Sequence, residues 1–257
     1  MEKLIKSNRI KGILCIITSA CGFAVMSAFI KLSGDLPSFQ KTFFRNLVAA
    51  AIALYLIIKH KGSLVGKKEN RKILVLRSIF GTIGIVCNYY AVDRLVLSDA
   101  NMLNKLSPFL VVIFCALFLK EKINLKQITM VSVAFIGALF IIKPSFNVEV
   151  IPYLVGVLGA VGAALAYTCV RVLGKKEDYY TIVFFFSTFS MLACVPYLIV
   201  DFHPISTQQM IFLLLTGLAA AGGQFGITAA YTYAPAREIS VYDYTQIMFS
   251  AVLGFLF

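Results

Sequence analysis

Two charged side chains inside long apolar stretches are the strongest candidates for chemistry in this 257-residue sequence. Lys105 lies six residues after Asp99, and Asp243 lies six residues after Arg237. If these stretches are membrane-spanning helices, a charge near their centre costs about 2.5–3.5 kcal/mol on insertion scales, so it usually faces a cavity or a partner. We therefore expect Lys105 and Asp243 to line a central cavity, where they pair with charges of a solute or with each other.

Other roles for these charges stay open at this point. Lys105 can instead extend to the lipid headgroups, and Asp243 can neutralise Arg237 or Arg171. Two further arginines lie about one turn inside their segments, where they can reach the headgroups or order the packing of helices: Arg45 and Arg77.

Polar and aromatic residues on the same segments extend the candidate site. Asn101 and Asn104 are three residues apart and Tyr242 and Gln246 are four apart, so each pair shares one helix face. Any of these side chains can serve packing alone, but together they would form an amphipathic cavity for a small polar organic molecule. The predicted substrate-binding set is Asn88, Tyr89, Asn101, Asn104, Lys105, Tyr167, Arg171, Gln224, Tyr231, Tyr242, Asp243 and Gln246.

The elements that position these residues follow from composition and apolar runs. The chain is 60% hydrophobic and 14% charged, whereas soluble proteins are roughly 45–50% apolar and about 25% charged. Lipid is the solvent that such a surface requires. Runs of about 20 apolar residues can each cross a bilayer, which predicts an all-α membrane protein. Nine stretches qualify: 10–31, 41–59, 73–92, 99–119, 126–143, 152–173, 180–200, 207–233 and 237–257.

The formal net charge of +12 comes from cations gathered in short clusters between these stretches. Seventeen of the 24 Lys and Arg fall on one side of the predicted topology. Excess Lys and Arg mark the cytoplasmic side, so we expect a cell-membrane protein with a cytoplasmic N-terminus. Nucleic-acid binding is not expected, because the positive charge is not concentrated on one face or arm.

Catalytic and cofactor chemistry find little support in the residue pattern. The six cysteines lie inside apolar stretches without CxxC spacing, and both histidines lie near segment ends. We expect no metal site, no cofactor and no enzymatic activity. A membrane-embedded enzyme and a helical scaffold without transport remain the alternatives. In the absence of a nucleotide-hydrolysing motif, a proton or another coupling ion, or exchange, would supply the energy.

An internal repeat divides the chain into units 1–145 and 152–257. Five spans per unit is an odd number, so the second unit would enter the membrane from the opposite side. Span 126–143 has no counterpart, and we expect that a tenth helix is absent from this sequence. Near the unit starts an offset of 144 residues relates Gly12 to Gly156. An offset of 139 residues pairs Ala91 with Ala230, Asp99 with Glu238, Asn104 with Asp243, and Ser107 with Gln246.

Small residues spaced along single helix faces predict close helix packing in lipid. Gly156, Gly159 and Gly162 form one such face, and Gly222 and Gly226 form another. Pro108 removes a backbone hydrogen bond inside the stretch 99–119 and is expected to kink it.

Several short motifs in their order and spacing resemble the EamA-like branch of the drug/metabolite transporter superfamily. The resemblance implies ten helices in two inverted five-helix units. It also implies a secondary transporter that carries a small metabolite, such as an amino acid, by alternating access, with export as the expected direction. The Gly-Glu pair that usually closes the ninth helix in this family does not occur here. The motifs are Phe43-Phe44-Arg45-Asn46, Leu76-Arg77-Ser78-Ile79-Phe80-Gly81, Ser107-Pro108, Phe118-Leu119-Lys120-Glu121-Lys122, Ala234-Pro235 and Tyr242-Asp243-Tyr244-Thr245-Gln246.

Overall fold

The computed structural model describes residues 2–95, 97–142 and 150–256, and the regular elements in this part of the chain are helices. Residues 143–149, where the two predicted units meet, lie outside the described residues. Three short 3-10 helices are η1 Lys68–Asn70, η2 Gly174–Lys176 and η3 Ser240–Tyr244. The α-helices are α1 Glu2–Leu32, α2 Ser38–His60, α3 Arg71–Arg94, α4 Leu97–Asn104, α5 Leu106–Leu119, α6 Leu125–Ile142, α7 Val150–Leu173, α8 Tyr179–Val200, α9 Thr207–Tyr233, α10 Ala236–Ile239 and α11 Thr245–Leu256.

Seven helical stretches in the described residues are long and apolar enough to cross a membrane. The chain is therefore a multi-pass α-helical membrane protein. Two of the nine predicted spans are not among the seven: 126–143, which corresponds to α6, and 237–257. The seven are Asn8–Leu32, Ser38–His60, Lys68–Ala91, Met102–Leu119, Val150–Leu173, Tyr179–Val200 and Thr207–Tyr233.

Large apolar side chains cover much of the outer surface. Tyr55 and Ile58 on α2, Leu117 and Phe118 on α5, and Ile199 on α8 are between 62% and 80% exposed. Each square ångström of such surface would cost about 25 cal/mol in water. Lipid removes this cost, so these side chains mark the lipid-facing surface of the bundle.

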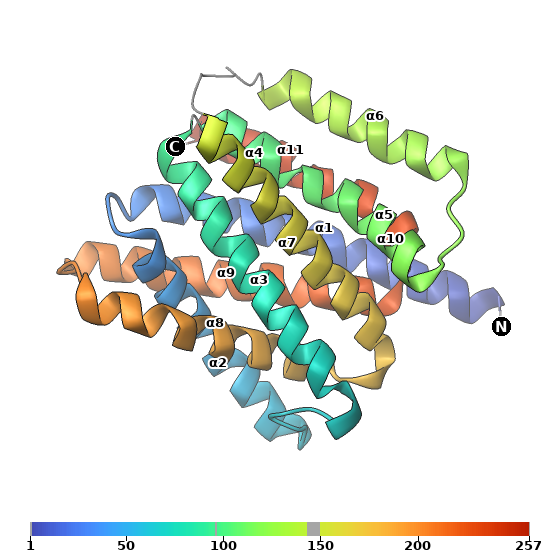
Figure 1. Ribbon diagram of the computed structural model, residues 1–257, viewed down its shortest axis with the longest axis horizontal. Helices are drawn as coiled ribbons and strands as arrows, with labels where there is room; N and C mark the ends of the chain where they lie inside the picture. The colour runs from blue at the N-terminus through green and yellow to red at the C-terminus, as the bar shows by residue number, and fades with distance from the viewer. Residues whose placement is uncertain (1, 96, 143–149, 257) are drawn as a thin grey trace.

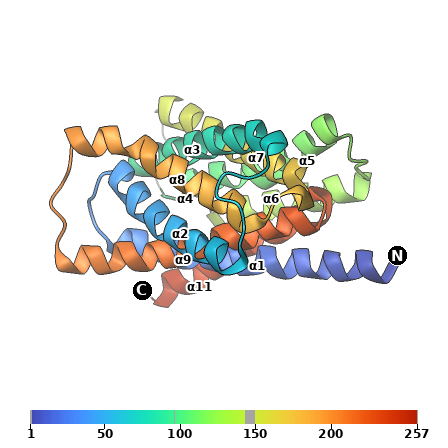
Figure 2. The same ribbon diagram turned by 90° about the horizontal axis from the view of Figure 1, so that it is seen from below.

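The most extensive helix contacts join α1 to α9, α3 to α7 and α2 to α8 (Figures 1 and 2). Glycines bring two of these pairs together. A Cβ added to Gly22 would lie 2.8 Å from the backbone nitrogen of Gly223, and one added to Gly84 would lie 2.9 Å from that of Ala163. The prediction for Gly222 was wrong, because a Cβ there would have no described atom within 4 Å.

The predicted helix 99–119 is broken at Lys105. α4 ends at Asn104 and α5 begins at Leu106. Lys105 has a ψ of −2°, compared with about −42° in a regular α-helix. Pro108 accounts for the break, because its ring would collide with the carbonyl of Asn104 four residues earlier. The expected kink is therefore a full interruption.

The predicted helix 237–257 is interrupted as well. α10 passes into the 3-10 helix η3, and α11 then begins at Thr245. A 3-10 segment between α-helical turns often marks a hinge or local strain. At the offset of 139 residues Lys105 matches Tyr244, the last residue of η3. The two breaks thus fall at matching positions of the repeat.

Two buried polar side chains hold loops at the bundle ends. Near the start of α2, Gln40 donates to the carbonyl of His203 at 2.8 Å and accepts from its N–H at 3.1 Å. Before α8, Glu177 accepts from the N–H of Lys67 at 2.8 Å and from Nδ2 of Asn70 at 2.7 Å. Each unit therefore uses one side chain to fix a loop of the other.

We expect Glu177→Ala to lower the free energy of unfolding by about 1–3 kcal/mol, because it leaves two donors without their acceptor. Trypsin should also cut the loop more rapidly after Lys67, whose N–H loses its bond. Glu69→Ala, an exposed glutamate of the same loop, is the matched control. Equal digestion rates for both variants would show that Glu177 does not restrain this loop.

Candidate functional site

Lys105 and Asp243 form a direct ion pair where the two helix breaks meet. Nζ of Lys105 lies 3.3 Å from both Oδ2 and the carbonyl oxygen of Asp243, and it donates to Oε1 of Gln246 at 2.6 Å. In return, the hydroxyl of Tyr244 donates to the carbonyl of Lys105 at 2.9 Å. A helix break releases backbone carbonyls from helical bonding, and here each break supplies a side chain that binds a carbonyl of the other.

These contacts decide between the alternatives left open for the two charges. The side chains of Lys105 and Asp243 are only 8% and 10% exposed, so Lys105 does not extend to the headgroups. Arg171 instead pairs with Glu121 at 2.8 Å, and Arg237 donates to a backbone carbonyl. Asp243 is therefore neutralised by Lys105 and not by either arginine.

An aromatic stack adjoins this cluster. The rings of Tyr167 on α7 and Tyr231 on α9 stack with centroids 5.4 Å apart, and the Tyr231 hydroxyl lies 3.3 Å from Oγ of Ser240 in η3. The guanidinium carbon of Arg77 lies 5.9 Å from the Tyr167 ring and 4.0 Å from the Phe186 ring. Residues from α3, α7, α8 and α9 thus converge beside the two helix breaks.

Arg45 and Arg77 are buried, with relative exposures of 6% and 2%, so the interpretation that they reach the headgroups is wrong. Their charges act on each other and on Tyr167. They therefore belong to the central cluster, although they were not predicted as site residues. The only sequence signal was their position inside apolar segments. That position gives the depth of a residue in the helix but not the direction of its side chain.

The remaining predicted residues are less closely connected to the cluster. Gln224 is buried and donates to Thr228 on its own helix at 3.4 Å. The buried hydroxyl of Tyr89 has no hydrogen-bond partner among the described residues. Asn101 lies in α4, but its side chain is outside the described residues. Half-buried positions are occupied by Asn88, Asn104 and Tyr242.

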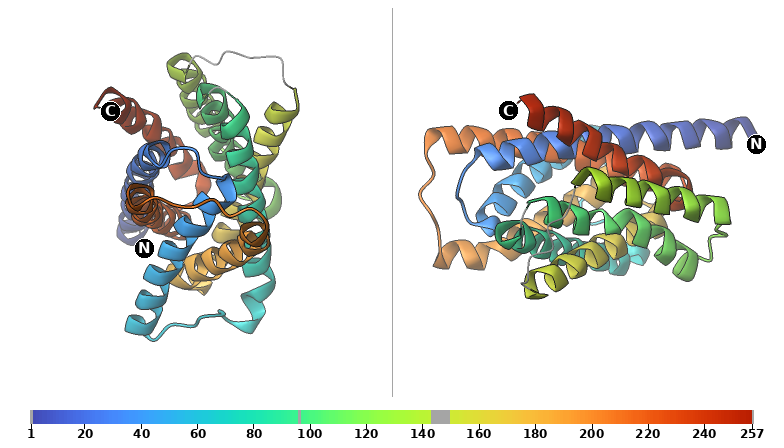
Figure 3. Two further views of the ribbon diagram at one scale, coloured as in Figure 1. Left: turned by 90° about the vertical axis from the view of Figure 1, so that its left-hand side faces the viewer. Right: turned by 90° about the horizontal axis from the view of Figure 1, so that it is seen from above.

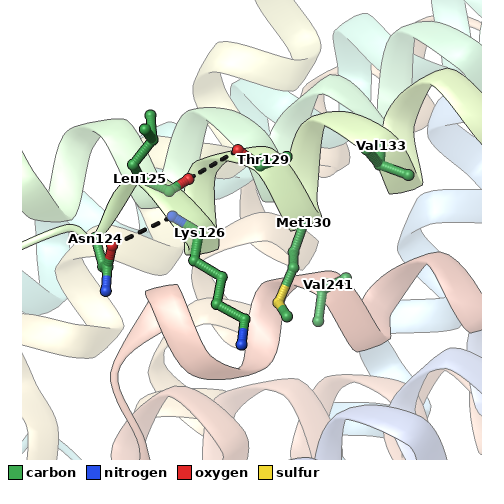
Figure 4. Close-up of a pocket in the computed structure, with 7 residues that line it drawn as sticks. All are labelled: Asn124, Leu125, Lys126, Thr129, Met130, Val133 and Val241. Atoms are coloured by element: carbon green, nitrogen blue, oxygen red, sulfur yellow. Dashed lines mark hydrogen bonds between the residues drawn. The ribbon is translucent and has the colours of Figure 1, made fainter.

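The pockets described lie away from these residues. The larger is an open groove between the first half of α6 and Val241, toward which Lys126 and Met130 extend (Figure 4). α6 itself lies at the edge of the bundle (Figure 3). In the described part of the chain no three His, Cys, Asp or Glu residues are grouped to hold a metal ion. The central cluster is thus a packed polar core with charged, aromatic and amide groups suited to binding a polar solute.

Comparison with known proteins gives consistent results. The profile of the EamA-like transporter family matches residues 10–143 and 150–257. The pseudopaline exporter CntI of Pseudomonas aeruginosa is 33% identical over 96% of this chain and 87% of its own length. Solute carrier family 35 member G1 of the mouse is 26% identical over 96% of this chain and 71% of its own. One protein of known crystal structure shares the fold, with a TM-score of 0.82, 14% identity and coverage of 95% and 87%.

Proposed function

Because this chain belongs to the EamA-like transporter family, we propose that it is a secondary transporter that exports a small metabolite by alternating access. Its relatives carry the names of transporters, which establishes a membrane transporter and favours this class over enzymes. The observation that carries the finer proposal is the pair of interrupted helices joined through Lys105 and Asp243. Interrupted helices near the middle of the membrane are where many secondary transporters bind their solutes.

Matched contacts support the further proposal that two inverted units build the bundle. Asp99 on α4 accepts from the hydroxyl of Tyr153 on α7. Glu238 on α10 pairs with Arg9 on α1 at 3.4 Å. The offset of 139 residues relates Asp99 to Glu238, and the offset of 144 relates Arg9 to Tyr153. Each unit therefore binds the first helix of the other through equivalent positions, as a two-fold arrangement requires.

In this proposal the two units move against each other about the central ion pair. A solute with its own charges competes for Lys105 or Asp243, which weakens the bond between the breaks and lets one side open. The stacked Tyr167 and Tyr231 supply apolar walls, and Gln246 supplies an amide oxygen. The cytoplasmic N-terminus, the plasma membrane and coupling to a proton or another ion belong to the same proposal.

The test is solute movement by the pure full chain in proteoliposomes. Labelled pseudopaline is the first solute to assay, because a relative is named for its export, and amino acids come next as the class predicted from the sequence. We expect movement that depends on an imposed ion gradient or on exchange, and that Asp243→Asn abolishes. If no solute moves faster than in empty liposomes or with Asp243→Asn, the proposed function is wrong.

A further inference from the structure

Arg77 is the buried cation whose bonding the protein leaves incomplete. Its guanidinium packs against the rings of Phe186 and Tyr167. Ring contacts engage the face of a guanidinium, whereas its five N–H donors point outward in its plane. Nε of Arg77 is buried without a hydrogen-bond partner in the described residues. A buried donor of a charged group without an acceptor is costly, so this atom requires an explanation.

Arg45 brings a second positive charge to the same place. It is buried on α2, and its charge acts on Arg77 and on Tyr167. Like charges in a medium of low dielectric constant repel strongly. The nearby acids do not relieve this repulsion, because Asp243 pairs with Lys105 and Glu121 pairs with Arg171. Among the described residues neither Arg45 nor Arg77 takes part in an ion pair.

We infer that Arg77 and Arg45 bind the carboxylate of a small organic anion, which is the solute that the protein carries. The inference rests on the proposed function and adds the charge of the solute to it. A guanidinium matches a carboxylate with two parallel hydrogen bonds, and the rings around Arg77 hold its plane in a fixed orientation. A bound carboxylate would accept from Nε of Arg77 and relieve the repulsion between the two arginines.

Thermal unfolding of the full chain in detergent tests this inference. The probes are citrate, glutarate and L-glutamate, each compared with a neutral amide such as glutaramide or L-glutamine, and with inorganic phosphate. We expect at least one carboxylate to raise the unfolding temperature while its amide does not. Arg77→Gln and Arg45→Gln should each weaken this protection at least about tenfold, because a charge-assisted hydrogen bond is lost. Arg71→Gln, an exposed arginine at the start of α3, is the matched control and should keep the protection.

Arg77→Lys separates binding from packing. It keeps the positive charge but loses the planar fork, so protection by the carboxylate should fall even if the variant is as stable as the original protein. The inference is overturned if amides or phosphate protect as well as carboxylates, if protection survives in Arg77→Gln, or if no carboxylate protects. Movement of neutral or cationic solutes that is unaffected by Arg77→Gln would overturn the inference and leave the proposed function intact.

Discussion

Asp243→Asn should stop solute movement and lower the free energy of unfolding by about 3–5 kcal/mol, because it leaves the buried ammonium of Lys105 without its countercharge. The loss is expected to be large because Lys105 and Asp243 are both almost fully buried. Unfolding in mixed detergent micelles measures the stability, and proteoliposomes measure the flux. Asp201→Asn is the control, since Asp201 is about half exposed and pairs with His203 at the membrane edge.

The double variant Lys105→Gln with Asp243→Asn separates stability from transport. It replaces the ion pair with two neutral amides that can bond each other, so much of the lost stability should return. Flux should not return, because the proposal assigns the charges themselves to the solute. A double variant that transports like the original protein would reduce the ion pair to a structural contact.

The sequence predicted the depth of residues along the helices better than their direction. Apolar runs predicted most spans, since about 20 apolar residues suffice to cross the bilayer whatever their neighbours are. The repeat offset correctly placed Asn104 and Asp243 at matching positions, which is where the breaks meet. The direction of a side chain depends on which helix packs beside it. For that reason Arg45 and Arg77 were interpreted as able to reach the lipid headgroups, although they point inward.

The breaks show a second limit of sequence reasoning. Pro108 made a kink in the first unit predictable, because its effect on the preceding turn is local. The 3-10 helix Ser240–Tyr244 contains no proline or glycine. Its geometry accompanies tertiary contacts, including the hydroxyl of Tyr244 on the carbonyl of Lys105. Such contacts join residues 139 positions apart, so no local pattern could reveal them.

Gly226→Ala should destabilise the protein by about 1–3 kcal/mol, because overpacking forces the backbones of α9 and α1 apart. The new Cβ would lie 2.8 Å from the carbonyl oxygen of Cys15 and 3.0 Å from the backbone nitrogen of Ser19. Backbone atoms cannot move aside as the end of a flexible side chain can. Gly222→Ala on the same helix is the matched control, and it should gain roughly 0.5–1 kcal/mol of helix stability since its Cβ meets no described atom.

Combining Gly226→Ala with Gly84→Ala tests both glycine contacts at once. Gly84 packs α3 against α7 as Gly226 packs α9 against α1, and the two sites share no described contact atoms. Their costs should add to about 2–6 kcal/mol, as expected for independent sites. Because each contact joins one proposed unit to the other, any motion between the units must pass through both. Flux per folded molecule should therefore fall in the double variant and stay normal in Gly222→Ala. If flux per folded molecule is unchanged, the units do not move against each other at these helix pairs.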